Sequence, residues 1–255
     1  MNANILAAPF VLVAAALLYF VMEGRDELAL WLAGTILILA VIYILAPQIN
    51  WYFQKKQPPP LPDGARRFLL QNSRFFQGLS NEDKRRFEER AGLWMNARNW
   101  QAQNLESVPE DIKLTICEAA LQVWWDDENW LLDDFEQVVL FMGPFPTPQH
   151  HAWHASETEF EDKTWLFSVD HLLRAFVEPH NFPRLDLYEM CKTYLAKHPS
   201  RPFPEPTRAE VEQLSGFPHG RVEAFLGLPI TDLRPLAMAY RLQFADRLTV
   251  DVSSN

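Results

Sequence analysis

Cysteine is scarce in this chain of 255 residues, which contains only Cys117 and Cys191. Secreted modules that depend on disulfides carry several cysteines at regular spacing, so this sparse usage favours a reducing compartment. Whether the two residues form a single bridge depends on geometry, which the sequence leaves open. The cysteine content therefore argues against a disulfide-stabilised secreted module.

Positive charge is also in short supply. The chain has 23 Lys and Arg residues against 33 Asp and Glu residues, which gives a formal net charge of −10. Proteins that bind DNA or RNA through the phosphate backbone present clusters of basic side chains. The sequence also lacks internal repeats and long low-complexity segments. Nucleic acid is therefore not expected as a partner.

Charged side chains are absent from the first 22 residues. Residues 5–22 are apolar or small, and a second uncharged apolar run covers residues 28–46 after a polar turn. At about 1.5 Å per residue, 18 helical residues span about 27 Å, which is enough to cross a bilayer. A cleaved signal peptide would begin with basic residues, and Met1–Asn4 has none. The sequence therefore predicts a transmembrane hairpin in residues 1–54, with helices at about 5–22 and 28–46.

The distribution of basic residues predicts the orientation of this hairpin. Arg25 is the one basic residue of the turn, and Lys55, Lys56, Arg66 and Arg67 follow the second helix. Because basic residues are enriched on the cytoplasmic side, the larger C-terminal part is expected in the cytoplasm. Neither run contains an acidic, basic or histidine side chain, so the hairpin is expected to be an anchor in the lipid bilayer and not an ion path. Pro47 is expected to end the second helix.

The remainder is expected to form one domain. Residues 55–62 are rich in proline and predict a semi-rigid linker, and residues 63–255 are enough for a single core. Ser80 and Asp83 predict a helix start. Hydrophobic periodicity and flanking prolines predict further helices at 110–124, 185–196 and 236–248, and strands at 138–141 and 165–169. The predicted fold class is α+β and mostly helical.

Several motifs resemble those of a known family in their order and spacing. They are Leu79-Ser80-x-Glu82, the apolar helix 112–123, Trp130-x-x-Asp133-x-Phe135-x-x-Val138-Val139-Leu140, Gly143-Pro144-Phe145, Lys163 to Ser168, and Val169-Asp170 to Pro179-His180-Asn181. Together they resemble the Mlc titration factor A family of bacterial zinc peptidases, over roughly residues 61–195. The resemblance implies a zincin-like fold for the soluble domain and places the hairpin in a bacterial inner membrane.

Zinc peptidases of this kind carry H-E-x-x-H on a helix, because histidines four residues apart share one face and both bind the metal. The matching segment here reads Tyr188-Glu189-Met190-Cys191-Lys192. Tyr188 and Lys192 thus replace two ligands, and Arg234 stands at the place proposed for the third. A lysine ammonium repels a dication. The retained Glu189 is either a general base without its metal or, as we prefer, a helix carboxylate paired with Lys192. No cofactor is expected.

His150-His151-x-x-His154 is the alternative metal site. On a helix, His150 and His154 would share a face and could hold zinc. The segment follows a run of prolines, however, and no glutamate lies between the histidines as it does in H-E-x-x-H. A solvated loop is the preferred interpretation, with zinc as the alternative cofactor.

Three functions of different classes follow from these observations. The leading hypothesis is a catalytically inactive peptidase-like protein that binds or regulates a protein partner at the cytoplasmic face of the membrane. The second is a structural or assembly subunit of a membrane complex, in which tryptophans such as Trp124, Trp125 and Trp130 would serve as interface anchors, although core packing is the preferred interpretation of these side chains. The third is an active zinc-dependent hydrolase with a displaced metal site at His150 and His154.

Overall fold

The computed structural model describes residues 3–103 and 106–245. The chain divides into two compact units, Met1–Pro59 and Pro60–Asn255. The division falls inside the proline-rich segment, where proline cannot continue a regular helix. The described residues are mostly helical with one small sheet, so the predicted fold class, α+β and mostly helical, is confirmed.

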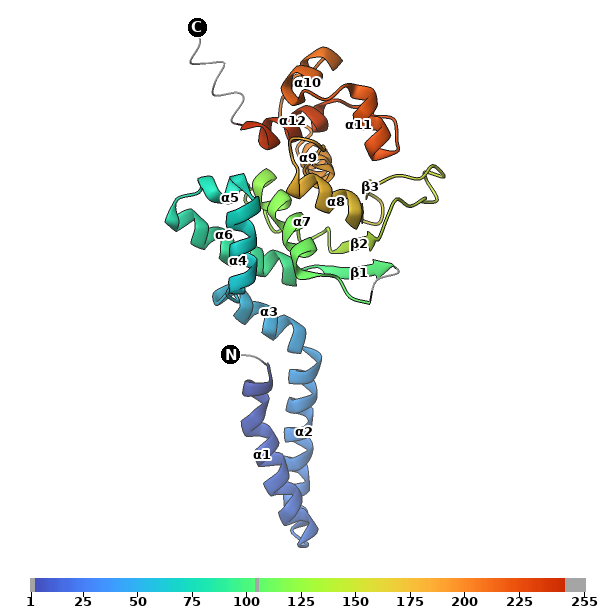
Figure 1. Ribbon diagram of the computed structural model, residues 1–255. Helices are drawn as coiled ribbons and strands as arrows, with labels where there is room; N and C mark the ends of the chain where they lie inside the picture. The colour runs from blue at the N-terminus through green and yellow to red at the C-terminus, as the bar shows by residue number, and fades with distance from the viewer. Residues whose placement is uncertain (1–2, 104–105, 246–255) are drawn as a thin grey trace. The chain divides into compact units, whose positions relative to one another are not determined.

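Two apolar helices make up most of the first unit (Figure 1). α1 (Ala3–Met22) is joined to α2 (Ala29–Ile44) through Gly24 and the short 3-10 helix η1 (Asp26–Leu28). Gly24 has a φ of +91°, a left-handed backbone that glycine adopts without steric cost. Both helical stretches are long and apolar enough to cross a membrane. Tyr43 and most other large apolar side chains of the two helices are exposed.

The second helix ends just before Pro47, as expected, but another helix follows it. α2 ends at Ile44, and α3 (Ala46–Lys56) begins almost at once with Pro47 in its first turn. The first N–H groups of a helix have no partner within it, so a proline there costs little. The N–H of Ala3 donates a hydrogen bond to Oδ1 of Asn50 at 2.7 Å, which ties the start of α1 to α3.

The second unit contains the sheet and most of the helices. In chain order its elements are α4 (Asp63–Asn72), α5 (Arg74–Gly78), α6 (Asn81–Asn96), β1 (Asn99–Gln103), α7 (Glu110–Val123), β2 (Gln137–Phe141), β3 (Ser156–Glu159), β4 (Thr164–Ser168), α8 (Val169–Val177), α9 (Leu185–Lys197), α10 (Arg208–Ser215), α11 (His219–Leu226) and α12 (Arg234–Gln243). The predicted cap of α6 is confirmed, because the N–H of Asp83 donates to Oγ of Ser80 at 3.1 Å. α12 begins at Arg234 and not at Leu236, with Pro235 in its first turn. It ends at Gln243, earlier than the predicted end at Leu248, which itself lies outside the described residues.

The four strands form one sheet in the order β1-β2-β4-β3. β1, β2 and β4 are parallel, and β3 pairs antiparallel with β4 at one edge. The sequence predicted β2 and β4, which are rich in β-branched and aromatic residues, and it missed β1 and β3. Both missed strands are largely polar, and β3 consists of Ser156, Glu157, Thr158 and Glu159.

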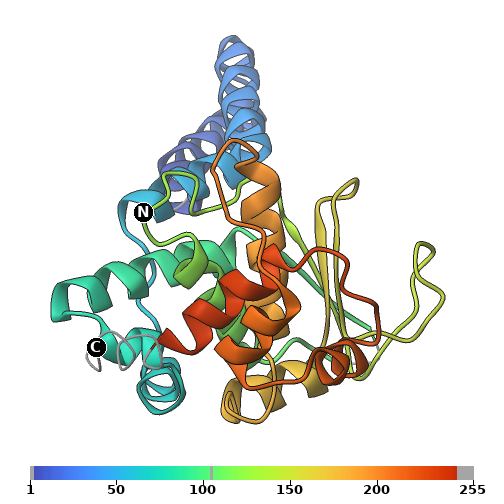
Figure 2. The same cartoon turned by 90° about the horizontal axis from the view of Figure 1, so that it is seen from above.

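Helices cover one face of this sheet (Figure 2). α7 packs against α6 and α9, and α9 also contacts β3. Alternate residues of the central strands point into this layer and are fully buried, namely Val138, Leu140, Trp165 and Phe167. The edge strand β3 and the helix α9 therefore lie next to each other, which positions the candidate site.

Tryptophans fill much of the core. Trp94 and Trp165 are fully buried with ring centroids 6.0 Å apart, and Trp165 also stacks on Phe135 at 4.7 Å. Trp124 is fully buried as well, which confirms the preferred interpretation of core packing for this residue and rules it out as an interface anchor. Trp125 stays partly exposed and makes contact with surface arginines.

The two cysteines are separate and buried, one in α7 and one in α9. Cys117 and Cys191 are both free, so they form no bridge with each other. Burial raises the pKa of both thiols well above the ordinary range. Neither sulfur has the electropositive, accessible surroundings that make a cysteine nucleophilic.

A buried ionic network joins α7 to the start of α9. The guanidinium of Arg184 donates to Glu118 at 2.7 Å and to both carboxylate oxygens of Asp186. Ser73 donates its hydroxyl to the other oxygen of Glu118 at 2.6 Å. The Arg184 guanidinium also lies over the ring of Phe176, at 4.6 Å from its centroid. Because each buried charge has a partner, the network is tolerated in the interior.

Candidate functional site

Helix α9 carries the central residues of the candidate site. Its first three turns are buried almost all round, and Glu189 has only 1% of its surface exposed. Tyr188 and Lys192 stand four residues apart, so they share one face of the helix. Lys192 reaches back along that face, with its ammonium 5.5 Å from the Tyr188 ring centroid.

Three donors hold the carboxylate of Glu189 in place. Ser156 donates its hydroxyl to Oε1 at 2.8 Å, and Thr158 donates its hydroxyl to Oε2 at 2.7 Å. Lys192 places its ammonium 2.8 Å from Oε2, which confirms the ion pair expected from the helical spacing. Ser156 and Thr158 reach the same carboxylate because alternate residues of a strand point to the same face. Glu189 is therefore fixed by β3 on one side and by its own helix on the other.

Tyr188 contributes a neutral phenol beside this carboxylate. Burial, together with the nearby negative charges of Glu189 and Asp232, raises the pKa of its hydroxyl. A tyrosine that stays protonated is a poor metal ligand, because metal binding requires a deprotonated oxygen. Its ring instead forms an apolar wall next to the ammonium of Lys192.

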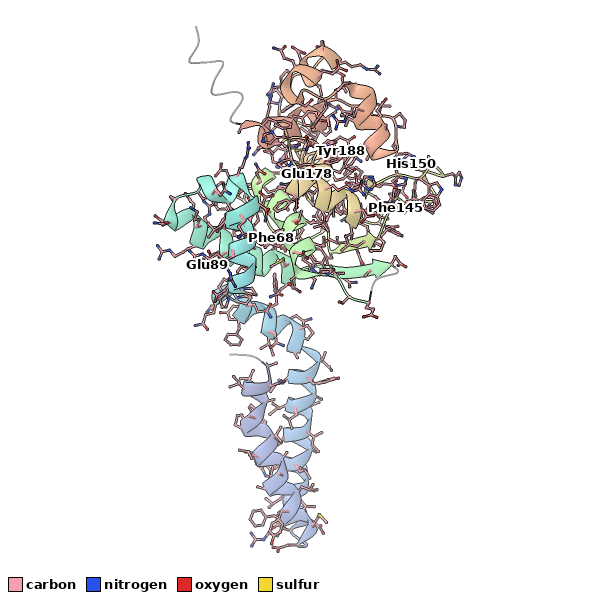
Figure 3. All side chains as sticks on the ribbon, in the orientation of Figure 1. Phe68, Glu89, Phe145, His150, Glu178 and Tyr188 are labelled. Carbon is pink, nitrogen blue, oxygen red and sulfur yellow. The ribbon has the colours of Figure 1, made fainter. Side chains whose placement is uncertain are left out.

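A cleft of about 630 Å³ opens beside α9. Its lining includes Tyr188, Glu189, Lys192 and Arg234, so the structure brings the sequence-predicted residues together. Arg234 is exposed and forms a bidentate pair with Asp232, with N–O distances of 2.7 and 3.0 Å. Figure 3 marks Tyr188 on α9 and His150 on the loop that precedes β3.

The histidines of the alternative metal site lie in a loop and not on a helix. His150 is about half exposed, whereas the side chain of His154 is completely buried and its backbone pairs with Phe145. Glu157 of β3 joins them, with its carboxylate 3.0 Å from Nε2 of His154 and 3.6 Å from Nε2 of His150. As the side chains stand, the described part of the chain has no group of three such residues arranged around a metal ion.

Sequence reasoning missed the three residues that β3 supplies. Ser156, Glu157 and Thr158 lie in a short polar segment without a recognisable motif, and only the pairing with β4 shows which side each one faces. The alternation along β3 sends Ser156 and Thr158 toward Glu189, and it sends Glu157 toward the histidines. One strand thus serves two different clusters.

No protein-family model matches this sequence, and no curated protein or solved structure shows significant similarity to it. The interpretation of the cleft therefore depends on its geometry and on the motifs of the chain itself.

Proposed function

We propose that the chain is a membrane-anchored, catalytically inactive peptidase-like protein that binds a polypeptide segment in the α9 cleft without cutting it. The observation that carries this proposal is the Glu189–Lys192 pair inside the cleft, at 2.8 Å. In the resemblance to zinc peptidases, Lys192 stands at a metal-ligand position. Here its ammonium is the cation that compensates the glutamate, so a second cation at that point would meet repulsion.

The neighbouring residues support a binding role and argue against hydrolysis at this point. Tyr188 is a neutral phenol, and Arg234, which stands at the place proposed for the third ligand, has its guanidinium paired with Asp232. General-base catalysis also needs a carboxylate that is free to accept a proton from water. Glu189 instead accepts from two hydroxyls and an ammonium, and each of these contacts stabilises it as a fixed structural group.

The lining of the cleft favours a polypeptide as the ligand. It combines polar side chains, such as Glu157 and Lys192, with apolar ones, such as Phe160 and Phe203. A few placed polar groups among apolar side chains are typical of ligand sites. The volume of the cleft, about 630 Å³, is within the range of typical ligand sites.

The two apolar helices support a membrane location for this activity. The hairpin contains no acidic, basic or histidine side chain within either apolar run, and Lys55, Lys56, Arg66 and Arg67 follow α2. We therefore place the hairpin in a bacterial inner membrane and the second unit, with a zincin-like fold, in the cytoplasm. The polypeptide bound would then belong to a cytoplasmic protein or to an exposed part of a membrane complex.

A bulky residue in the cleft tests the proposal. Ala196 lies on α9, is exposed and lines the cleft, so Ala196→Trp is expected to fill the cleft without disturbing the core. Ala209→Trp on the exposed face of α10 is the matched control. The full chain in mild detergent is titrated into fluorescent, reduced and carboxymethylated lactalbumin, a permanently unfolded polypeptide, and binding is followed by anisotropy. Ala196→Trp is expected to weaken binding at least tenfold, and the control is expected to leave it unchanged.

Cleavage of the same polypeptide decides between binding and hydrolysis. Incubation with excess zinc is expected to leave the polypeptide intact, as judged by mass spectrometry. Zinc-dependent fragments that disappear in the Glu189→Gln variant would overturn the proposal. An equal loss of binding in both tryptophan variants would also contradict it.

A second candidate function, as a subunit of a membrane complex, is favoured by one surface cluster. The ring of Trp125 lies under Arg86 at 4.7 Å and Arg90 at 5.3 Å, and Arg90 also lies 4.7 Å from the ring centroid of Trp130. Tryptophan and arginine dominate the residues that carry binding energy at protein interfaces. A stable partner that co-purifies with the wild type in mild detergent and is lost from Trp125→Ala would support this role.

A further inference from the structure

We propose that His150, His154 and Glu157 form a zinc-binding site at the rim of the α9 cleft, separate from Glu189. The sequence pointed to the two histidines, and the structure adds the third ligand. Two imidazoles and one carboxylate are an established ligand set for zinc, with one position left for water or another ligand. Binding at this place does not depend on the proposed polypeptide-binding function.

The hydrogen bonding of His154 is the first argument. Its Nδ1 lies 2.8 Å from the carbonyl oxygen of Ala152, and a carbonyl can only accept, so Nδ1 carries the proton. In the neutral ring, Nε2 is then an unprotonated acceptor. It nevertheless lies 3.0 Å from Oε2 of Glu157, another acceptor when ionised, in a position that is completely buried. A cation between these two atoms, either a proton or a metal ion, removes the repulsion.

The orientation of His154 matches that of a metal ligand. Histidines that bind metals usually donate their other ring N–H to a backbone carbonyl or a carboxylate, which fixes the ring and the tautomer. The contact from Nδ1 to Ala152 has this arrangement and directs the free Nε2 toward Glu157. The backbone is held as well, because His154 and Phe145 exchange two hydrogen bonds of 2.9 and 3.0 Å.

The second histidine brings a third potential ligand to the same carboxylate. Nε2 of His150 lies 3.6 Å from the other oxygen of Glu157, which is too long for a hydrogen bond. Ligand atoms about 2.0–2.2 Å from a tetrahedral zinc ion are roughly 3.4 Å from each other. The two separations from Glu157, 3.0 and 3.6 Å, are close to this value but reach different oxygens, so a shared zinc ion requires that both oxygens bind it or that one side chain turns.

The cluster becomes a metal site through a small movement of one side chain. His154 and Glu157 are fixed by burial, and His150 is about half exposed on its loop, so its ring can turn at little cost. Because His150 and Glu157 line the cleft, the open coordination position would be reached from the cleft. A carboxylate of a bound polypeptide is the kind of ligand that this position would accept.

Zinc titration of the full chain in detergent tests the site. The protein is treated with a chelator, freed of it, and titrated with zinc by calorimetry at neutral pH. The wild type is expected to bind one zinc ion, and loss of a ligand in His154→Ala, Glu157→Gln or His150→Ala is expected to weaken binding by about a hundredfold or more. His151→Ala, an exposed histidine of the same loop, is the matched control and is expected to bind as the wild type does.

Substitution with cobalt(II) gives an independent readout, because tetrahedral coordination produces strong visible absorption bands that the ligand variants should lose. Far-UV circular dichroism shows whether the buried His154→Ala variant folds. If it does not fold, the isosteric Glu157→Gln and the exposed His150→Ala variants still test the site. A wild type that binds no zinc, or binding that His151→Ala weakens as much as His150→Ala, would overturn the proposal. Polypeptide binding that persists in chelator would leave the proposed function standing even then.

Discussion

Arg184 is the residue on which the buried carboxylates of Glu118 and Asp186 depend. Replacement by methionine keeps much of the side-chain volume but leaves Glu118 and Asp186 without their cation. An uncompensated buried charge typically costs about 3–5 kcal/mol, so Arg184→Met is expected to lower the free energy of unfolding by that amount. Urea unfolding of the full chain in detergent, followed by tryptophan fluorescence, measures it. Arg85→Met on the exposed face of α6 is the control and should change stability by less than about 0.5 kcal/mol.

His171 is expected to make stability depend on pH. Burial lowers the pKa of its imidazole, the charge of Arg174 lowers it further, and Asp170 opposes the shift. A histidine with a depressed pKa in the folded state stabilises the protein above its ordinary pKa of about 6.5, and this stability is lost as the pH falls. His171→Gln is therefore expected to flatten the decline in unfolding free energy between about pH 7 and pH 5. An unchanged slope in His171→Gln, or the same flattening in the exposed His151→Gln, would contradict this assignment.

At the scale of elements, Gly227 is the point where α11 meets the loop that carries the two histidines. It ends α11 with a φ of +86°, and an added Cβ would lie 2.2 Å from the carbonyl oxygen of Trp153. The N–H of Ala155 also donates to the carbonyl of Leu226 at 2.7 Å. The backbones of the loop and of the end of α11 are therefore in direct contact, and neither can move away from an added side chain. Gly227→Ala is expected to lower the unfolding free energy by more than about 2 kcal/mol.

Gly220→Ala is the matched control for this prediction. Gly220 lies in the same helix, and an added Cβ would meet nothing within 4 Å. Since alanine is the better helix former, this change is expected to raise stability by up to about 1 kcal/mol. Opposite signs for the two variants in thermal unfolding would support the close approach, and equal effects would contradict it.

Two elements, α9 and β3, differ in how well the sequence predicts them. Helix α9 was predictable because hydrophobic periodicity and the preceding proline are local signals, and its spacing placed Tyr188, Glu189 and Lys192 correctly relative to each other. β3 was not, because serine and glutamate disfavour strands, and only the pairing with β4 shows that this segment is one. Two of the three partners of Glu189, and the carboxylate beside His154, come from β3. Part of each cluster was therefore invisible until the pairing of β3 was known.

At the scale of the whole molecule, the orientation of the hairpin in the membrane decides in which compartment the α9 cleft lies. The basic residues after α2 predict that both termini are cytoplasmic. A fluorescent protein that matures only in the cytoplasm, fused after Asn255, is expected to be active. Alkaline phosphatase, which folds only in the periplasm, is expected to be inactive at the same position and active when inserted in the turn near Glu27. The reverse pattern would overturn the proposed location.

Because both sulfur atoms are buried, the natural chain should not react with thiol reagents, and single added cysteines can be labelled selectively. A membrane-impermeant maleimide is expected to leave the native protein unmodified, because Cys117 and Cys191 are enclosed and their thiols resist ionisation. A cysteine introduced by Glu27→Cys should react in cells whose outer membrane alone is permeable, whereas Ser200→Cys should react only after the inner membrane is opened. The labelling of one added cysteine thus shows on which side of the membrane that residue lies, and Cys117 and Cys191 do not have to be replaced first.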